Sequence, residues 1–498
     1  MTVLRLHADD DVGIARQALA AGDPVVDGVA ARDAVPAGHK VALRDLPAGA
    51  PVHKYGQLIG YTTAPVAAGE HVHAHNLEFR AVGDREYEVG TAVVPVEPAP
   101  DLATFDGIVR PDGRVATRNY LGVLTSVNCS ATVAKLIAAR ADRLLADFPH
   151  VDGVVALTHG TGCGMTAPGD GLAVLRRTLQ GYARHPNFAG LVVVGLGCEV
   201  NQIADISFDT PTPIRTLTIQ EAGGTAAAVR AGLAALEELL PAAEEGGRRQ
   251  PVPASHLVLG LQCGGSDGYS GITANPALGV ASDLLVRHGG TSILGETPEV
   301  YGAEHLLTRR AVSAEVADRL ITRIRWWERY TAANQGSMDN NPSPGNKAGG
   351  LTTILEKSLG AVAKAGHSPL AEVVEYAEAV NGPGLVFMDT PGYDPVSVTG
   401  MVAGGANIIA FTTGRGSVFG CKPVPSLKLC TNTPTYDRMS EDMDVNCGRI
   451  LDGTATLEEV GREIFQLLLD TASGHQTLSE QLGFGDEEFT PWQLGAVL

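Results

Sequence analysis

Four cysteines follow apolar segments that we predict to be buried strands, each among glycines or other small residues. They are Cys129, Cys163, Cys198 and Cys263, in the segments YLGVLTSVNCS, GVVALTHGTGCG, GLVVVGLGCE and HLVLGLQCGGSDG. In an open parallel sheet, ligands bind outside the carboxyl ends of the strands. Thiolates gathered there would suit iron, zinc or an iron–sulfur cluster. The alternative is that each cysteine is simply a small buried hydrophobic residue.

Three histidines alternate in the segment GEHVHAHN: His71, His73 and His75. On a strand, alternate residues point to one face, and imidazole is the commonest metal ligand in proteins. Two of them, with a nearby carboxylate or a residue from elsewhere, would hold a divalent ion; His39 and His53 are weaker companions. The alternative is a solvated strand face whose histidines bond to backbone.

Two of the cysteine turns carry further polar residues. In THGTGCGM, His159 stands on a glycine-rich turn whose backbone N–H groups can approach an anion, and it could act as an acid or base. In GCEVNQ, Glu199 and Asn201 suit a ligand that carries hydroxyl groups. The alternative is structural, because a histidine at a strand end often holds the backbone and an acid often caps a helix.

The turn CGGSDGYSG adds Ser266 and Asp267, and cations stand inside other glycine- or proline-rich loops. Arginine binds carboxylates through two hydrogen bonds, and lysine serves as a point charge or a base. In a chain of net charge −19, such cations point to an anionic small molecule, although each could be a surface ion pair. These cations are Arg114, Arg118, Lys347, Arg415 and Lys422.

An α/β pattern must position most of these residues. Strands are predicted near 120–128, 152–158 and 190–196, and helical segments follow them, which predicts βαβ units and a mostly parallel sheet. The pattern resumes from residue 257, with helices predicted at 301–332 and 454–472. Between these helices, the polar segment GSMDNNPSPGNKAGG, 336–350, is typical of an ordered functional loop.

These patterns divide the chain into three folded parts. Short β-like pieces separated by glycine turns predict a small β barrel or clip in residues 1–92. The segment 93–105, with VVPVEPAP, has the composition of a linker. We predict a first α/β domain over 106–250 and a second over 251–498.

The composition of the chain limits the kinds of partner that we expect it to bind. The net charge of −19 argues against nucleic acid and anionic membranes. Seven cysteines without a disulfide-like spacing favour a reducing compartment, and there is no signal-peptide pattern and no run of 18 apolar residues. We therefore expect a cytoplasmic protein that acts on a small molecule; the sequence leaves homo-oligomerisation open.

Several long strings resemble the altronate/galactarate dehydratase family, among them GRVATRNYLGVLTSVNCSAT, LQCGGSDGYSGITANPALG and MDNNPSPGNKAGGLTTILEKSLGA. The resemblance covers essentially the whole chain and implies that its first part is a SAF-like domain. It also implies a hydro-lyase that acts on a hexonate, with D-altronate losing water to give 2-dehydro-3-deoxy-D-gluconate. Members of the family depend on Fe²⁺, and Mn²⁺ is associated with some.

The chemistry of dehydration next to a carboxylate explains why we expect metal ligands in this chain. The C2 proton is weakly acidic and the C3 hydroxyl is a poor leaving group, so a Lewis acid and a general acid are needed. We expect Cys163, Cys198 and Cys263 to ligate the iron, with Cys129 in reserve; alternatively the histidines of the first domain, His71 and His73, supply the ion. Whether the iron is mononuclear or part of a cluster stays open.

The remaining roles follow from the same chemistry. Either His159 or Lys347 would be the base, and Glu199 the acid. Arginines would anchor the carboxylate, and amides, hydroxyls and carboxylates would orient the polyol; these substrate contacts are Arg114, Arg118, Asn201, Ser266, Asp267, Asn341 and Arg415.

Other activities fit parts of the pattern. Galactarate dehydratase and sulfolactate sulfo-lyase share it, so the same pocket could take a different 2-hydroxy acid. A non-catalytic sugar-acid sensor is less favoured, because the cysteines and basic loops are all present. A linker at 93–105 would also let the first domain close, so that its histidines meet the α/β pocket.

Overall fold

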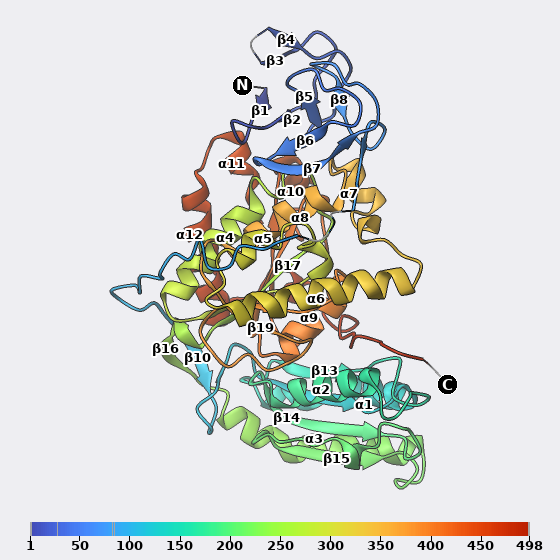
Figure 1. Cartoon of the computed structure of the whole chain (residues 1–498). Coiled ribbons are helices and arrows are strands. Elements are labelled where there is room, and N and C mark those ends of the chain that lie inside the picture. The colour runs from blue at the N-terminus through green and yellow to red at the C-terminus, as the bar shows by residue number, and fades with distance from the viewer. Residues whose placement is uncertain (1, 27, 82, 84, 497–498) are drawn as a thin grey trace.

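The computed structural model describes residues 2–26, 28–81, 83 and 85–496. Three bodies follow one another from top to bottom in Figure 1: a β-rich first domain, a third domain built on a large sheet, and a second domain with a smaller sheet. The α/β architecture predicted after an N-terminal β-rich domain is confirmed. No helix in the described part of the chain is long and apolar enough to cross a bilayer.

The first domain consists of short antiparallel strands around a small apolar core that includes Val41, Val52, Ile59 and Val72. The turn before the histidine segment requires glycine: Gly69 has a φ of +86°, and a Cβ there would lie 2.0 Å from the Ala30 oxygen. The sheets run in the orders β1-β2-β5-β8, β6-β7-β9 and β3-β4. Their strands are β1 (Val3–Leu4), β2 (Val12–Ala15), β3 (Pro24–Val26), β4 (Val29–Ala30), β5 (Lys40–Ala42), β6 (Pro51–Lys54), β7 (Gln57–Thr62), β8 (His71–Val72) and β9 (Leu77–Glu78).

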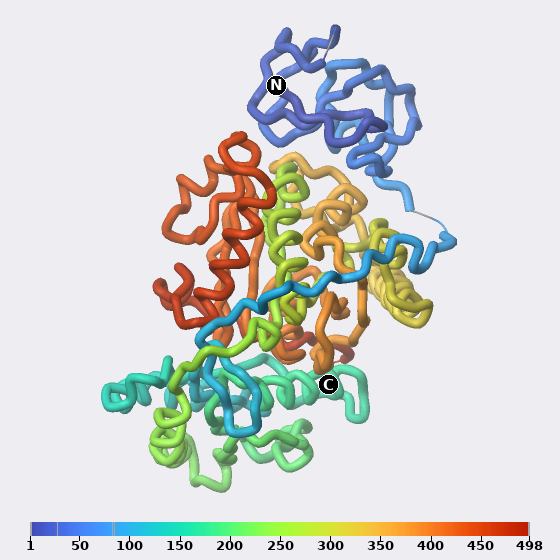
Figure 2. The backbone as a smooth tube through the Cα atoms, turned by 90° about the vertical axis from the view of Figure 1, so that its left-hand side faces the viewer, coloured from blue at the N-terminus to red at the C-terminus, as the bar shows by residue number. Residues whose placement is uncertain are grey.

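The connection to the second domain is longer than the predicted linker. The described residues between β9 and β10 form no helix or strand, and this passage runs across the third domain (Figure 2). Backbone bonds hold it there, from Gly90 N to Thr308 O at 3.1 Å and from Ala99 N to Arg287 O at 2.9 Å. It is therefore a strap along the third domain rather than a free spacer.

The second domain has a four-stranded parallel sheet in the order β13-β12-β14-β15. Its central strand β12 is buried along its whole length, because α1 and α3 pack together with its one face and α2 lies on the other. A small antiparallel sheet, β11-β10-β16, closes the domain. The elements are β10 (Thr104–Val109), β11 (Val115–Ala116), β12 (Tyr120–Thr125), α1 (Ala131–Ala141), β13 (Gly153–Leu157), α2 (Asp170–Arg184), β14 (Phe188–Gly195), β15 (Ile214–Thr218), α3 (Thr225–Glu245) and β16 (Arg249–Pro253).

The third domain is a seven-stranded parallel sheet, in the order β19-β20-β18-β17-β21-β22-β23, covered by helices. Its strands are β17 (Val258–Cys263), β18 (Thr291–Leu294), β19 (Leu370–Val374), β20 (Gly384–Met388), β21 (Ile408–Thr413), β22 (Ser426–Cys430) and β23 (Val445–Asn446). Its helices are α4 (Ala274–Arg287), α5 (His305–Thr308), α6 (Ala314–Ala333), α7 (Pro344–Ala348), α8 (Ile354–Val362), α9 (Asp394–Ala403), α10 (Thr433–Arg438), α11 (Gly448–Asp452), α12 (Leu457–Ala472) and α13 (Leu478–Gln481).

The two ends of the strands in the seven-stranded sheet face different domains. After β17, the Tyr269 hydroxyl donates to Ala15 O of the first domain at 3.0 Å. Before β21, Asn407 O accepts a 2.7 Å bond from Thr117 of the second domain. The carboxyl ends of the strands, where ligands bind in such folds, thus face the first domain.

Candidate active site

Three histidines of the first domain form a compact cluster. His71 lies on β8, His73 follows two residues later, and His39 precedes β5, the strand that pairs with β8. One ring nitrogen of each lies within 4.8 Å of the others, and His39 Nδ1 is 3.0 Å from His71 Nε2. His39, expected only as a weaker companion, is part of the cluster, whereas His75 is exposed beside it.

The electrostatics of the cluster fit a metal ion. Burial, together with the nearby imidazoles and Lys40, lowers the pKa of His71 to about 4 and that of His73 to about 3, so their lone pairs are available near neutral pH. His73 Nδ1 is buried without a hydrogen-bond partner, which is costly for a polar atom. Two nitrogens each about 2.1 Å from one ion stand roughly 3 Å apart, as His39 and His71 do. The residues therefore fit a divalent ion that accepts imidazole, such as Fe²⁺.

Buried charges dock the first domain on the third. Lys40 Nζ, next to His39 in sequence, donates to Glu356 Oε2 and to Gly350 O, both at 2.7 Å, and Lys54 Nζ donates to Glu356 Oε1 at 2.9 Å. Although burial opposes it, the two ammonium groups hold the pKa of Glu356 well below its usual range. Sequence analysis missed this network; the available signal was two lysines inside otherwise apolar strands, HKVAL and PVHKY.

The docked histidines meet the polar loop that the sequence singled out. His39 Nε2 lies 3.2 Å from Ala348 O, at the end of α7, and Lys347 is half-buried one residue earlier. A Cβ on Gly349 would lie 3.3 Å from Arg415 Cδ, which places Arg415, just after β21, against the same loop. Within the described residues, neither Lys347 nor Arg415 has a carboxylate within salt-bridge distance, although the charge of Lys347 acts on Asp339 from farther away. The junction thus combines neutral imidazoles with two uncommitted cations.

Asp267 braces this junction rather than facing it. Its carboxylate accepts bonds from Ser270 Oγ (3.0 Å), Thr431 Oγ1 (2.9 Å) and Asn432 Nδ2 (3.1 Å), and burial raises its pKa. With these donors in place, Asp267 holds the loop after β17, and its expected contact with substrate stays a prediction. Its neighbour Ser266 is buried, and its backbone oxygen accepts from Asn346 on α7.

Cys263 lies below the junction in a closed ionic network. Its Sγ is 2.8 Å from Lys364 Nζ and 3.3 to 3.4 Å from the carboxylates of Glu299 and Glu296. Lys364 pairs with Glu296 at 2.5 Å and Lys357 with Glu299 at 2.8 Å. Cys263, Glu296 and Glu299 offer ligand atoms within 4.8 Å of one another, although the two ammonium groups already pair with the carboxylates. The expected role of Cys263 as an iron ligand stays a prediction.

Asn341 is committed to the same network. Its Nδ2 donates to Glu299 Oε1 at 2.8 Å, and its Oδ1 accepts from Lys357 Nζ at 2.6 Å. Both ends of the amide are therefore used at the start of the polar loop, and the expected contact of Asn341 with substrate stays a prediction.

The other three predicted cysteine ligands gather elsewhere. Cys129, Cys163 and Cys198 follow β12, β13 and β14 of the second domain, and all three are exposed. The expected convergence of four thiols therefore divides into three and one, because β17 belongs to a different sheet. Sequence spacing does not reveal which strands share a sheet.

His159 supports one of these loops. Its Nε2 lies 3.0 Å from Thr125 O and its Nδ1 lies 3.1 Å from Thr161 Oγ1, and burial lowers its pKa to about 4. Both ring nitrogens have partners within the protein, as the structural alternative expects, and the role of His159 as the base stays a prediction.

Glu199 and Asn201 support the other loop. Glu199 accepts from Ser126 Oγ at 2.7 Å and from Gly197 N at 2.6 Å, and although burial opposes it, these donors lower its pKa. Asn201 donates to Ser126 O at 3.0 Å and accepts from Arg176 Nε at 3.1 Å. Both side chains have partners within the protein, and their expected roles as acid and substrate contact stay predictions.

Two of the predicted carboxylate anchors have partners within the protein, and their expected contact with substrate stays a prediction. Arg118 is 3% exposed and divides its guanidinium between Glu480, at 2.6 and 2.8 Å, and the carbonyls of Thr471 and His475. Arg114 pairs with Asp112 at 2.6 Å. Of the predicted arginines, only Arg415 lies at the junction with the histidines.

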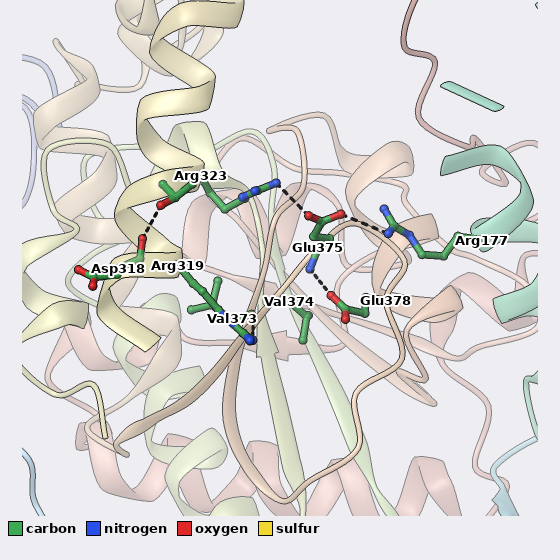
Figure 3. Close-up of a pocket in the computed structure, with 9 residues that line it drawn as sticks. Arg177, Asp318, Arg319, Arg323, Val373, Val374, Glu375 and Glu378 are labelled. Atoms are coloured by element: carbon green, nitrogen blue, oxygen red, sulfur yellow. Dashed lines mark hydrogen bonds and ion pairs between the residues drawn. The ribbon is translucent and has the colours of Figure 1, made fainter. Parts of the chain in front are cut away.

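A separate cavity of about 450 Å³ lies where α2 of the second domain meets α6 and β19 of the third. Figure 3 shows Glu375 between Arg177 and Arg323, at 3.2 and 3.4 Å. The three arginines lining the cavity face three carboxylates, so we interpret it as an ionic joint between the domains. The arginines are Arg177, Arg319 and Arg323, and the acids are Asp318, Glu375 and Glu378.

Family models cover nearly the whole chain. Residues 1–80 match the altronate/galactarate dehydratase SAF domain, residues 107–244 the second domain of D-galactarate dehydratase/altronate hydrolase, and residues 254–497 the C-terminal domain of D-galactarate/altronate dehydratase. These three segments correspond to the three bodies of the structure.

Named relatives extend over similar lengths. An altronate dehydratase of Bacillus subtilis (strain 168) is 35% identical over 499 residues, 99% of each chain. A galactarate dehydratase (L-threo-forming) of Escherichia coli (strain K12) is 38% identical over 500 residues, 97% of this chain and 95% of the relative. The (2R)-sulfolactate sulfo-lyase subunit beta of Chromohalobacter salexigens is 34% identical over 387 residues, 76% of this chain and 95% of the relative.

The chain is therefore an enzyme of the carbon–oxygen lyase class. It belongs to the D-galactarate/altronate dehydratase family, as its sequence motifs predicted.

Proposed function

We propose that this chain dehydrates the hexonate D-altronate to 2-dehydro-3-deoxy-D-gluconate and water, at the junction of the first and third domains. The observation that carries the proposal is the histidine cluster. Its His73 Nδ1 is buried without a partner, and His39 contacts the loop that carries Lys347 and adjoins Arg415. This junction joins metal-ligand chemistry with anion-binding chemistry.

The three histidines would hold Fe²⁺, with Mn²⁺ as an alternative. When bound, such an ion supplies Lewis-acid stabilisation for charge that develops on substrate oxygens. The Arg415 guanidinium would pair with the carboxylate through two hydrogen bonds and fix C2. The Lys347 amine, when neutral, would take the proton from C2 and, as the ammonium, return a proton to the C3 hydroxyl, which would leave as water. Lys40 and Glu356 would hold His39 next to the loop that carries Lys347, because they join the two domains directly.

The direct test is a substrate panel with protein purified without oxygen and supplied with Fe²⁺. We expect iron-dependent formation of the 2-keto-3-deoxy acid from D-altronate, lost in His73→Ala and kept in the matched control His75→Ala. Wild-type turnover in His73→Ala would overturn the assignment of the site.

Galactarate is the second candidate substrate, since a galactarate dehydratase is a relative of similar identity. Galactarate has a carboxylate at both ends, so the panel should separate the two by kcat/KM. A preference for galactarate, or for sulfolactate, would replace D-altronate while leaving the metal site in place.

A reducing compartment such as the cytoplasm fits this proposal. All seven cysteines are free thiols in the structure, and three of them are exposed.

A further inference from the structure

Three thiols meet at the carboxyl edge of the second domain's sheet. Cys129, Cys163 and Cys198 follow β12, β13 and β14, which are adjacent strands of one parallel sheet. Backbone bonds tie the three loops together, from Asn128 N to Thr161 O at 2.9 Å and from Asn201 N to Gly162 O at 3.0 Å. Parallel strands bring residues far apart in sequence to one edge, and here each strand delivers one cysteine.

The thiols are close but not close enough for one ion. Cys129 lies close enough to Cys163 and Cys198 for the three thiols to interact electrostatically. A zinc or iron ion with Zn–S-type bonds of about 2.3 Å requires sulfurs within about 4.6 Å of one another. Among the described residues, the groups with all ligand atoms within 4.8 Å are His39/His71/His73 and Cys263/Glu296/Glu299, and the three thiols are not such a group. A polynuclear cluster does not require that spacing, because it holds its cysteines on separate iron atoms.

The surroundings also suit inorganic sulfide. The loops contain Gly160, Gly162, Gly164 and Gly197, and glycine turns expose backbone N–H groups of the kind that line many iron–sulfur sites. Gln220 Nε2 already donates to Cys198 Sγ at 3.5 Å, and hydrogen bonds to sulfur tune such clusters.

The same surroundings lack the groups that dehydration needs. The polar residues of these loops, His159, Glu199 and Asn201, are occupied by the contacts that hold the loops in place. Arg176, a cation beside these loops, pairs with Asn201 and Asp205. This edge therefore offers ligands for a cluster but no uncommitted acid, base or carboxylate anchor among these residues.

We propose that Cys129, Cys163 and Cys198 ligate an iron–sulfur cluster of the [4Fe–4S] type, at a second metal site separate from the histidine junction. Three thiolates hold three irons, and the fourth iron has no cysteine ligand from the three loops. The proposal rests on the thiols alone and stands or falls independently of the substrate.

The test measures iron, acid-labile sulfide and visible absorption on the full chain, purified and reconstituted without oxygen. Wild-type protein should bind about four sulfides per chain. Cys163→Ser and Cys129→Ser should lose most of the sulfide and the absorption, while Cys421→Ala, which removes a buried cysteine of the third domain, should keep both. Wild-type protein without acid-labile sulfide after reconstitution, or with zinc in its place, would overturn the proposal, as would full sulfide in the serine variants.

Two further measurements keep the result independent of folding and of the proposed function. In the loaded wild-type chain, the three exposed cysteines should resist alkylation by iodoacetamide and become reactive when the iron is chelated. His73→Ala should keep its sulfide even if it loses turnover. Loss of sulfide in His73→Ala would show that the two sites are not separate and would overturn this proposal alone.

Discussion

The molecule has two groups of candidate metal ligands, the histidines at the junction of the first and third domains and the three cysteines of the second domain. The two groups differ in their surroundings. At the junction of the first and third domains, neutral histidines lie beside Lys347 and Arg415, which are not paired within the described structure. At the carboxyl edge of the second domain, exposed thiols lie among polar residues that are already hydrogen-bonded. Ligand type alone therefore does not distinguish the two places, and we propose the junction as the catalytic centre because uncommitted charge lies beside its ligands.

The largest expected effect comes from removing the histidine ligands. In His71→Ala/His73→Ala, turnover should fall by at least about a thousandfold, because the Lewis acid that stabilises the developing charge would be lost. Iron content and steady-state turnover would be measured together, with His75→Ala as the control on the same segment. If the double variant kept turnover within tenfold of wild type, the histidine site would be contradicted and the reaction would be assigned to the three cysteines of the second domain.

The docking charges come next. Glu356→Gln leaves Lys40 and Lys54 buried without their carboxylate, and breaking a buried pair in this way costs about 3–5 kcal/mol of unfolding free energy. Thermal unfolding should show the loss, and turnover should fall because the histidines no longer meet the loop. Lys40→Met/Lys54→Met/Glu356→Leu, which removes all the charges, should unfold at a higher temperature than Glu356→Gln. Equal melting of wild type and Glu356→Gln would show that the network does not dock the domain.

The same carboxylate gives a pH dependence with a defined sign. The pKa of Glu356 is lower in the folded chain than its ordinary value of 4.5, so the stability it contributes is present above that pH and is lost as the pH falls below it. Unfolding free energy should therefore decrease more steeply below about pH 4.5 in wild type than in Glu356→Gln. Parallel curves for the two proteins would contradict this.

Arg415 should have a smaller and more specific effect. Loss of its guanidinium removes charge-assisted hydrogen bonds worth about 1.5–3 kcal/mol, so Arg415→Ala should lower kcat/KM by roughly ten- to a hundredfold. Arg118→Ala, whose arginine is bonded to Glu480, should instead lower the melting temperature. If Arg415→Ala had unchanged kinetics, the carboxylate anchor would have to lie elsewhere.

The smallest effect is expected at the ionic joint between the domains. Glu375 is 51% exposed, and surface ion pairs are worth about 0–1 kcal/mol. Glu375→Gln should change neither turnover nor iron content by more than about twofold. A large change in both would mean that the histidine junction and the three cysteines of the second domain are coupled through this joint.

Strand and helix order could be predicted from the sequence to a useful extent. The strand expected near 120–128 is observed at Tyr120–Thr125, and the helix expected at 454–472 at Leu457–Ala472. The predicted helix at 301–332 is divided into α5 and α6, and the polar segment 336–350 contains the short helix α7. Hydrophobic periodicity predicts such elements because it follows from which side chains of a helix or strand are buried.

The grouping of the site residues could not be predicted in the same way. Cys263 was grouped with three cysteines of another sheet, since sequence does not show which strands pair. Asp267, Asn341 and Glu199 were expected at a substrate, but each is occupied by side chains from distant segments. The histidine pattern gave the ligands, whereas the lysines that dock them on the third domain became recognisable only with the fold.

The most direct test of the account is pulsed EPR on the chain loaded with Mn²⁺ under anaerobic conditions, before and after D-altronate is added. We predict nitrogen couplings from coordinated imidazole that are lost in His71→Ala/His73→Ala, and a change in the manganese spectrum when the substrate is added. A spectrum without nitrogen couplings, or one that D-altronate does not change, would contradict the assignment of the histidine junction as the catalytic metal site.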